Sequence, residues 1–187
     1  MEIVINVTIT GTKLTFILLS LLGAISLHAQ PNSNGYRALS TAPNSPQEFE
    51  RIAVCFQNER LIGKGSLKFT IDILRSYEKE FRANFHFSCE SPNPVTITFR
   101  ELPARELVQD ALGAARQRAG RILPEIEIFR GSVRRILGVV PPGIEGRAFA
   151  TIAAHELHHY LRQQAGHMST GLSSEFFTAQ DLMRGFN

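Results

Sequence analysis

Residues 146–164 read GRAFATIAAHELHHYLRQQ and decide the fold. Good helix formers dominate this stretch, Pro141 and Pro142 precede it, and Gly166 stands where a helix is expected to stop. We therefore predict one helix over 146–164. We also expect Gly166 to adopt a left-handed backbone that ends the helix and turns the chain back toward it.

Four of the six histidines fall within residues 153–172. His155 and His159 are four positions apart, so both imidazoles project from one side of the predicted helix, one turn apart. Zinc accepts neutral imidazole nitrogens, and catalytic zinc sites usually combine three protein ligands with one water. Glu156 completes the pattern HExxH, in which the glutamate acts as general base toward a zinc-activated water. The helix therefore predicts a catalytic zinc centre, against the alternative of a histidine cluster without metal.

A third ligand must follow the helix, because the helix itself supplies two. We expect it to be His167, which comes directly after the predicted turn. Glu175 is the main competitor, since 173–182 has the composition of a further helix, and Asp181 is a more distant one. His158 points about 60–100° away from the ligands and is expected to be a non-ligand.

The N-terminus has the pattern of a secretory signal peptide. Lys13 precedes the apolar run LTFILLSLLGAISL (Leu14–Leu27), and Ala29 offers a cleavage site. The run is shorter than the roughly 20 residues that span a bilayer, so we expect no stable membrane anchor after cleavage. We predict a signal peptide over 1–29 and a secreted or periplasmic protein. Residues 30–48 are rich in Pro, Asn and Ser and indicate a flexible lead-in.

Composition indicates a single folded domain over 49–187. The 187 residues are 43% apolar and 20% charged, which excludes global disorder. A net charge of +3 is too mild to imply nucleic-acid binding. Arginines 116, 118, 121, 130, 134 and 135 are expected to form a solvated face, with an anion site as the alternative. Cys55 and Cys89 are the only cysteines, and an even pair in an exported protein favours one disulfide over two buried thiols. The sequence does not indicate an oligomeric state.

The remaining pattern predicts one α+β domain. Strands are expected at 51–57, 85–89, 95–99 and 122–129, and a helix capped by Ser66 and ending near Ala83 lies between the first two. Pro124 favours an edge position or a strand start for 122–129, and residues 101–121 remain ambiguous.

The segment HELHHYLRQQAGHMSTGL (155–172) resembles small exported bacterial zinc-metallopeptidase-like proteins of the zincin HExxH class. These are similar to the metzincins, whose helix motif is HExxHxxGxxH, whereas this chain has HExxH, seven residues and a histidine. The resemblance implies a zincin-like, metzincin-type fold with a twisted mixed sheet, a backing helix and an HExxH active-site helix beneath the sheet. It also implies that His155, His159 and His167 bind zinc and that Glu156 is the base.

The expected function is a secreted zinc-dependent metallopeptidase, an endopeptidase that hydrolyses bonds in peptide or protein substrates. An extended substrate would pair with an edge strand of the sheet within 111–129. The alternative is a catalytically inactive zincin-fold binding module of the cell envelope.

Overall fold

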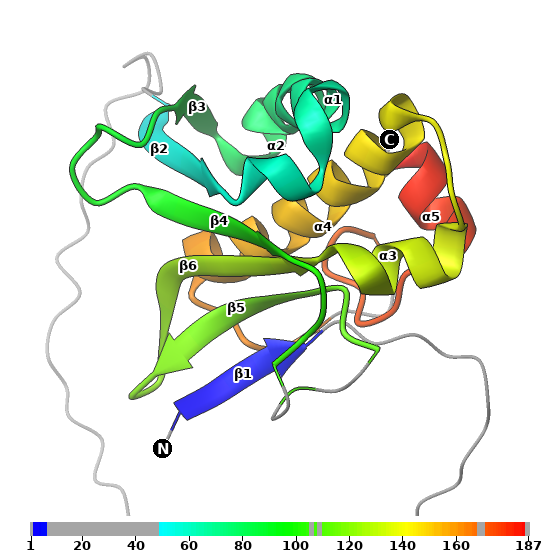
Figure 1. The fold of residues 1–187 in the computed structure, drawn as a ribbon. Helices are drawn as coiled ribbons and strands as arrows, with labels where there is room; N and C mark the ends of the chain where they lie inside the picture. Colours follow the sequence, from blue (N-terminus) through cyan, green and yellow to red (C-terminus); the bar gives the residue numbers. More distant parts are fainter. Residues whose placement is uncertain (1, 7–48, 105–106, 108–109, 168–170, 186–187) are drawn as a thin grey trace, which may run out of the picture. The chain divides into compact units, whose positions relative to one another are not determined.

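The computed structural model describes residues 2–6, 49–104, 107, 110–167 and 171–185, which form one mixed sheet and a set of helices (Figure 1). The strands are β1 (Glu2–Asn6), β2 (Glu50–Gln57), β3 (Ala83–Phe87), β4 (Val95–Arg100), β5 (Gly113–Arg118) and β6 (Arg121–Phe129). The helices are η1 (Glu59–Leu61), α1 (Gly63–Ser76), α2 (Glu78–Phe81), α3 (Arg130–Leu137), α4 (Pro142–Arg162) and α5 (Ala179–Arg184). A mixed sheet with helices agrees with the predicted α+β class.

The sheet order is β1-β5-β6-β4-β2-β3, and the four strands from β6 to β3 are parallel. Strand β5 is antiparallel to β6, and β1 is antiparallel to β5. Side chains alternate along β4: Val95, Ile97 and Phe99 are buried, whereas Thr96 and Thr98 are partly exposed. The buried face is the one that packs against the helices, as this period-two pattern requires.

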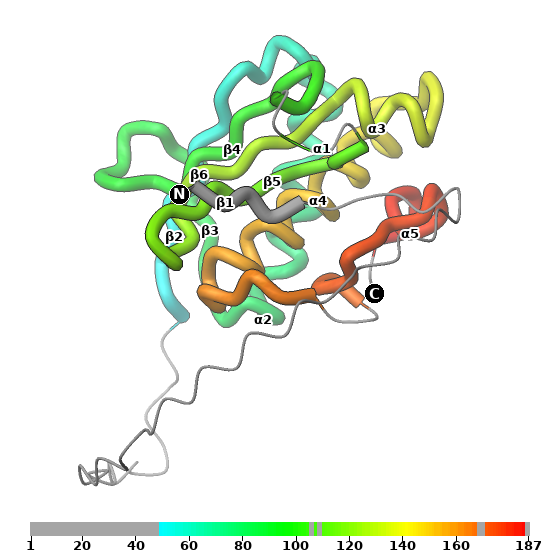
Figure 2. The backbone as a smooth tube through the Cα atoms, turned by 90° about the horizontal axis from the view of Figure 1, so that it is seen from below, coloured from blue at the N-terminus to red at the C-terminus, as the bar shows by residue number. Residues whose placement is uncertain are grey.

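Helices α1 and α4 lie side by side against the buried face of the sheet, and α5 lies beside α4 (Figures 1 and 2). The α1–α4 crossing depends on Gly146, where an added Cβ would lie 2.5 Å from the Ser66 carbonyl oxygen and 2.6 Å from Phe69 Cβ. Only glycine permits so close an approach of the two backbones. This contact sets how closely α1 and α4 approach each other.

The predicted role of Ser66 as a helix cap is wrong. Helix α1 begins earlier, at Gly63, and the buried Ser66 hydroxyl instead donates to the Glu145 carboxylate at 2.6 Å. Glu145 is 5% exposed and also accepts a hydrogen bond from Arg134 Nε at 2.9 Å. A buried carboxylate requires such partners, so this group joins the start of α4 to both α1 and α3.

Strand β6 is not the edge strand that Pro124 suggested, because it lies between β5 and β4. The ladder between β5 and β6 is irregular between Ala115 and Gln117, and the β4 pairing begins only at Glu125. Pro124 therefore falls in the interruption, where its missing N–H costs no ladder hydrogen bond. Of the ambiguous region 101–121, residues 113–118 form β5.

The predicted signal peptide (1–29) and lead-in (30–48) lie outside the described residues except for Glu2–Asn6, which form β1. Both therefore stay predictions. Within the described part of the chain, no helix combines the length and apolar character needed to cross a membrane.

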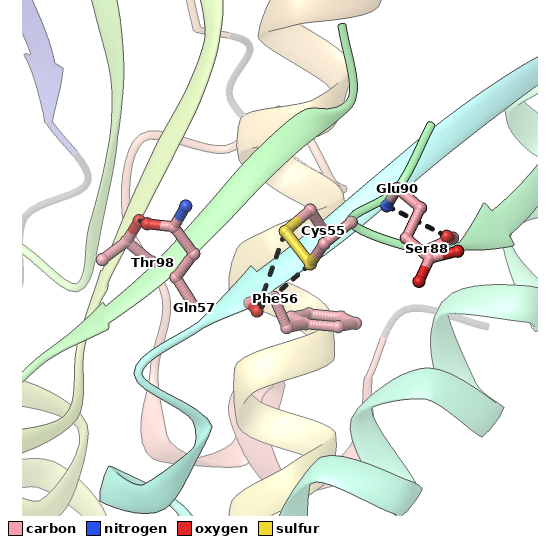
Figure 3. Close-up of a disulfide and its surroundings, with 7 residues drawn as sticks. Cys55, Phe56, Gln57, Ser88, Glu90 and Thr98 are labelled. Carbon is pink, nitrogen blue, oxygen red and sulfur yellow. Dashed lines mark hydrogen bonds between the residues drawn. A yellow bond between two sulfur atoms is a disulfide. The ribbon is translucent and has the colours of Figure 1, made fainter. Parts of the chain in front are cut away.

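The predicted disulfide is confirmed. Cys55 in β2 and Cys89, just after β3, are bonded with their Cα atoms 4.5 Å apart (Figure 3). The bridge joins two neighbouring parallel strands at one side of the sheet. It closes a loop that contains α1 and α2, since the two cysteines are 34 positions apart.

Loss of this bridge should lower stability. A closed loop of this length removes chain entropy worth about 4 kcal/mol from the unfolded state. The double variant Cys55→Ala/Cys89→Ala should therefore lose about 4 kcal/mol of unfolding free energy, measured by denaturant titration. Reductant should destabilise the wild type and leave the variant unchanged. Equal stability of the oxidised wild type and the variant would contradict the prediction.

Candidate metal centre

His155 and His159 lie on the buried side of α4, where they are 0% and 1% exposed. Each ring is held by a backbone carbonyl from the chain that follows the helix. His155 Nδ1 lies 2.6 Å from the Leu172 oxygen, and His159 Nδ1 lies 2.6 Å from the Gln164 oxygen. A carbonyl oxygen only accepts, so each Nδ1 carries the hydrogen and donates it.

This arrangement fixes the other nitrogen of each ring. With Nδ1 protonated, a neutral imidazole presents a bare lone pair at Nε2, and the two Nε2 atoms face each other at 2.9 Å. Burial, with His159 adding to its effect, lowers the pKa of His155 to about 3, and burial also lowers the pKa of His159, so a proton between the two Nε2 atoms is disfavoured. Two converging lone pairs fit a bound cation.

His167 completes a group of three. Ligand atoms of His155, His159 and His167 all lie within 4.8 Å of one another, and His167 Nε2 is buried without a hydrogen-bond partner in the described structure. The His167 ring lies 5.3 Å from that of His155 and 4.8 Å from that of His159, between centroids. The predicted ligand set is therefore brought together, and three imidazoles suit zinc.

The turn that delivers His167 differs from the prediction. Helix α4 ends at Arg162, and Gln163 rather than Gly166 takes the left-handed conformation, with φ 50°. The Gln163 side chain explains this choice. Its amide donates to the Ile122 oxygen and accepts from the Ile122 N–H, both at 3.0 Å. These bonds fasten the end of α4 to β6, so the turn occurs at the residue that they hold.

Neither competing ligand belongs to this group of three among the described residues. Glu175 is exposed and precedes α5, which begins only at Ala179, so the predicted helix over 173–182 is mostly wrong. Burial lowers the pKa of His167, and the Glu175 carboxylate partly opposes this shift. Asp181 instead forms a capping box with Thr178 at the start of α5.

Glu156 lies beside the histidines and faces β5. It is 0% exposed, and neither carboxylate oxygen has a hydrogen-bond partner among the described residues. Burial raises the pKa of Glu156 well above its ordinary value. The Ala115 amide opposes this rise, although its geometry falls short of a hydrogen bond. A buried carboxylate without a hydrogen-bond partner lowers the stability of the fold. Its presence is therefore better explained by a role in proton transfer than by a structural role.

Gly113 brings β5 close to this carboxylate. A Cβ at this position would lie 2.6 Å from Ile152 Cγ2 and 3.1 Å from Glu156 Oε1. The strand therefore runs directly over α4 at the level of Glu156. The sequence shows a glycine here, but which helix residue it would meet depends on the tertiary packing.

His158 is outside the group of three, as predicted. Its Nδ1 lies 3.2 Å from the Ser173 hydroxyl oxygen, and its ring lies 6.4 Å from that of Phe81. It therefore packs at the rim of the site, away from the converging nitrogens.

Zinc content should distinguish the two candidate third ligands. In protein prepared without a histidine tag, His167→Ala should weaken zinc binding by about 100-fold or more, because one of three ligands is lost. Glu175→Ala should keep the wild-type affinity, measured by chelator competition and elemental analysis. Zinc lost in Glu175→Ala but retained in His167→Ala would reverse the assignment.

The chain matches no protein-family model, no curated protein and no solved structure. No family is therefore assigned to it on these comparisons. What the site can do follows from its own residues: three converging imidazoles, one unpartnered carboxylate and a strand that passes close above them.

Proposed function

We propose that the chain is a secreted zinc-dependent metallopeptidase that cleaves bonds within peptide or protein substrates. The observation that carries the proposal is the pair of Nε2 atoms of His155 and His159, which face each other at 2.9 Å beside the unpartnered carboxylate of Glu156. His167 supplies the third nitrogen. This donor set fits Zn²⁺, and a site of three protein ligands leaves a position for water.

The arrangement of elements is consistent with a zincin-like fold. A mixed sheet covers α4, its antiparallel strand β5 passes above Glu156, and α1 packs beside α4 as a backing helix. These features are the ones that the resemblance of HELHHYLRQQAGHMSTGL to zincins implies, and they support that part of the proposal.

When bound, zinc would supply Lewis-acid chemistry, which makes a water proton easier to lose and draws electron density from a carbonyl. Glu156 then serves as general base and acid: it takes the proton from the attacking water and later delivers it to the leaving amine. Its burial favours this role, because a raised pKa makes the carboxylate a stronger acceptor. The Leu172 and Gln164 carbonyls hold His155 and His159 in the ring orientation that zinc binding needs.

An extended substrate would pair with the edge of β5 that faces away from β6. In the full chain that edge is paired with β1, whose residues Glu2–Asn6 fall within the predicted signal peptide. Cleavage after Ala29 would remove β1 and leave the backbone groups of β5 free to bind a peptide by main-chain hydrogen bonds. Export and catalysis are thus linked in the proposal.

The pairing of β1 with β5 also favours the second candidate, an inactive zincin-fold binding module of the cell envelope. If Glu2–Asn6 stay in place, they cover the edge on which a substrate would lie. Such a protein would retain zinc without cleaving denatured protein or mixed peptides.

Replacement of the general base tests the mechanism. Glu156→Gln keeps the shape of the side chain but not its proton affinity, so casein cleavage should fall by about 100-fold or more. Zinc content should be unchanged, because Glu156 is not among the grouped ligands.

Glu90→Gln is the matched control, since Glu90 is an exposed carboxylate after β3. It should cleave casein at the wild-type rate. Equal cleavage by Glu156→Gln and wild type would rule out the proposed mechanism, and zinc binding without any cleavage by wild type would favour the inactive module.

A further inference from the structure

A groove of about 1110 Å³ opens at the end of the sheet where β2 and β3 begin and β5 turns into β6. The residues that matter for its chemistry are Arg51, Arg118, Arg121, Asn84, Tyr160 and Gln163. Two of these, Tyr160 and Gln163, belong to the last turn of α4 and to its cap, so the groove reaches the end of the helix that carries His155 and His159.

The groove is positively charged. Its lining includes three arginines against one carboxylate, Glu50. Arg51, Arg118 and Arg121 are exposed and make no ion pair with any side chain that the structure describes. Other arginines do form such pairs: Arg75, Arg100, Arg116, Arg130, Arg134 and Arg135. Four of the six arginines predicted to form a solvated face therefore make ion pairs. The other two, Arg118 and Arg121, line this groove and make none with a described side chain.

Two of these arginines also oppose each other. Arg118 and Arg121 are direct partners in the β5–β6 ladder, so their side chains start from the same face of the sheet. Like charges directly opposite each other are destabilising. An anion bound between them would relieve this repulsion, which points to a negatively charged ligand.

The groove meets the path of a peptide paired with β5 at Arg118. Arg118 is three positions beyond Ala115, whose amide lies near Glu156, and three residues of strand span about 10 Å. The β1–β5 ladder gives the register of an antiparallel partner: Ile5 lies opposite Ala115, and Glu2 lies opposite Arg118. The chain's own N-terminal strand thus brings an acidic residue to this position.

We propose that this groove binds the acidic part of an extended peptide substrate. The acidic residue lies about three positions before the one opposite Ala115, next to Arg118 and Arg121, and Arg51 extends the site. The proposal rests on the proposed function for the identity of the ligand as a substrate. Arg118 and Arg121 then determine specificity and take no part in the chemical step.

Binding is measured first with Glu156→Gln protein that has been cleaved after Ala29, so that β1 no longer covers β5 and no turnover occurs. Two fluorescent peptides are compared. One has Glu at the third and fourth positions before the residue that is expected to lie opposite Ala115, and the other has Gln at both positions. The acidic peptide should bind about fivefold to tenfold more tightly, as two partly exposed charge pairs allow, and the difference should shrink at high salt.

Reversing the charge of the groove arginines tests whether they cause the preference for the acidic peptide. In the same background, Arg118→Glu/Arg121→Glu should abolish the preference, and Arg51→Glu should reduce it. Arg60→Glu is the matched control: Arg60 is exposed in η1, and its reversal should leave the preference intact. Equal affinities for the two peptides, failure of both to bind, or equally tight binding of a short single-stranded oligonucleotide would overturn the proposal.

Cleavage of the same two peptides by protein that keeps Glu156 separates this proposal from the proposed function. The acidic peptide should have the lower KM, with kcat little changed. Cleavage of both peptides with equal KM would contradict the role of the groove and agree with the proposed peptidase function. Arginine-dependent binding without cleavage would contradict the peptidase function and agree with the role of the groove.

Discussion

Two imidazole nitrogens with the same lone-pair character face each other 2.9 Å apart, and the rest of the centre depends on this contact. The Leu172 and Gln164 carbonyls leave neither ring free to turn, because each accepts the hydrogen of Nδ1. Burial disfavours the protonated form that would otherwise relieve the repulsion. A cation would satisfy both nitrogens, and His167 lies where it could add a third.

The position of β5 is the second constraint. Gly113 allows the strand to approach α4 at the level of Glu156, and the irregular ladder near Pro124 changes the pairing of β5 with β6 just beyond that point. Gln163 joins the end of α4 to β6, because its side-chain amide forms hydrogen bonds with the N–H and the carbonyl oxygen of Ile122. The sheet and the helix are therefore joined at two places, at β5 by the close approach of Gly113 and at β6 by Gln163. That geometry holds Glu156 and β5 in one unit.

Local sequence pattern was sufficient for the parts that depend on local structure. The strands near 51–57, 85–89 and 95–99, the long helix and the disulfide were all predicted from periodicity, composition and cysteine count. HExxH predicted His155, Glu156 and His159 together because a helical turn fixes their relative positions. His167 was expected near them because it follows Gly166 and because of the resemblance to zincins, and the three histidines do lie together.

The errors share a tertiary cause. Gly166 seemed the natural helix stop, yet a hydrogen-bonded pair between Gln163 and a distant strand ends the helix first. Ser66 had the composition of a cap but serves a buried carboxylate 79 positions away. Pro124 suggested an edge, although a ladder irregularity accommodates it inside the sheet. None of these partners can be identified from the residues nearby in sequence.

The chain that follows α4 has a consequence for the exchange kinetics of a bound ion. Gln164 and Leu172 orient two of the candidate ligands, and His167, between them in sequence, is the candidate third. Both orienting carbonyls and one of the three candidate ligands thus follow the helix, whereas the other two candidate ligands lie on it. An ion held by these ligands would leave at the rate at which the chain after α4 opens locally, well before the sheet unfolds. Its half-life toward a strong chelator would then report the opening of a single loop rather than the stability of the whole domain.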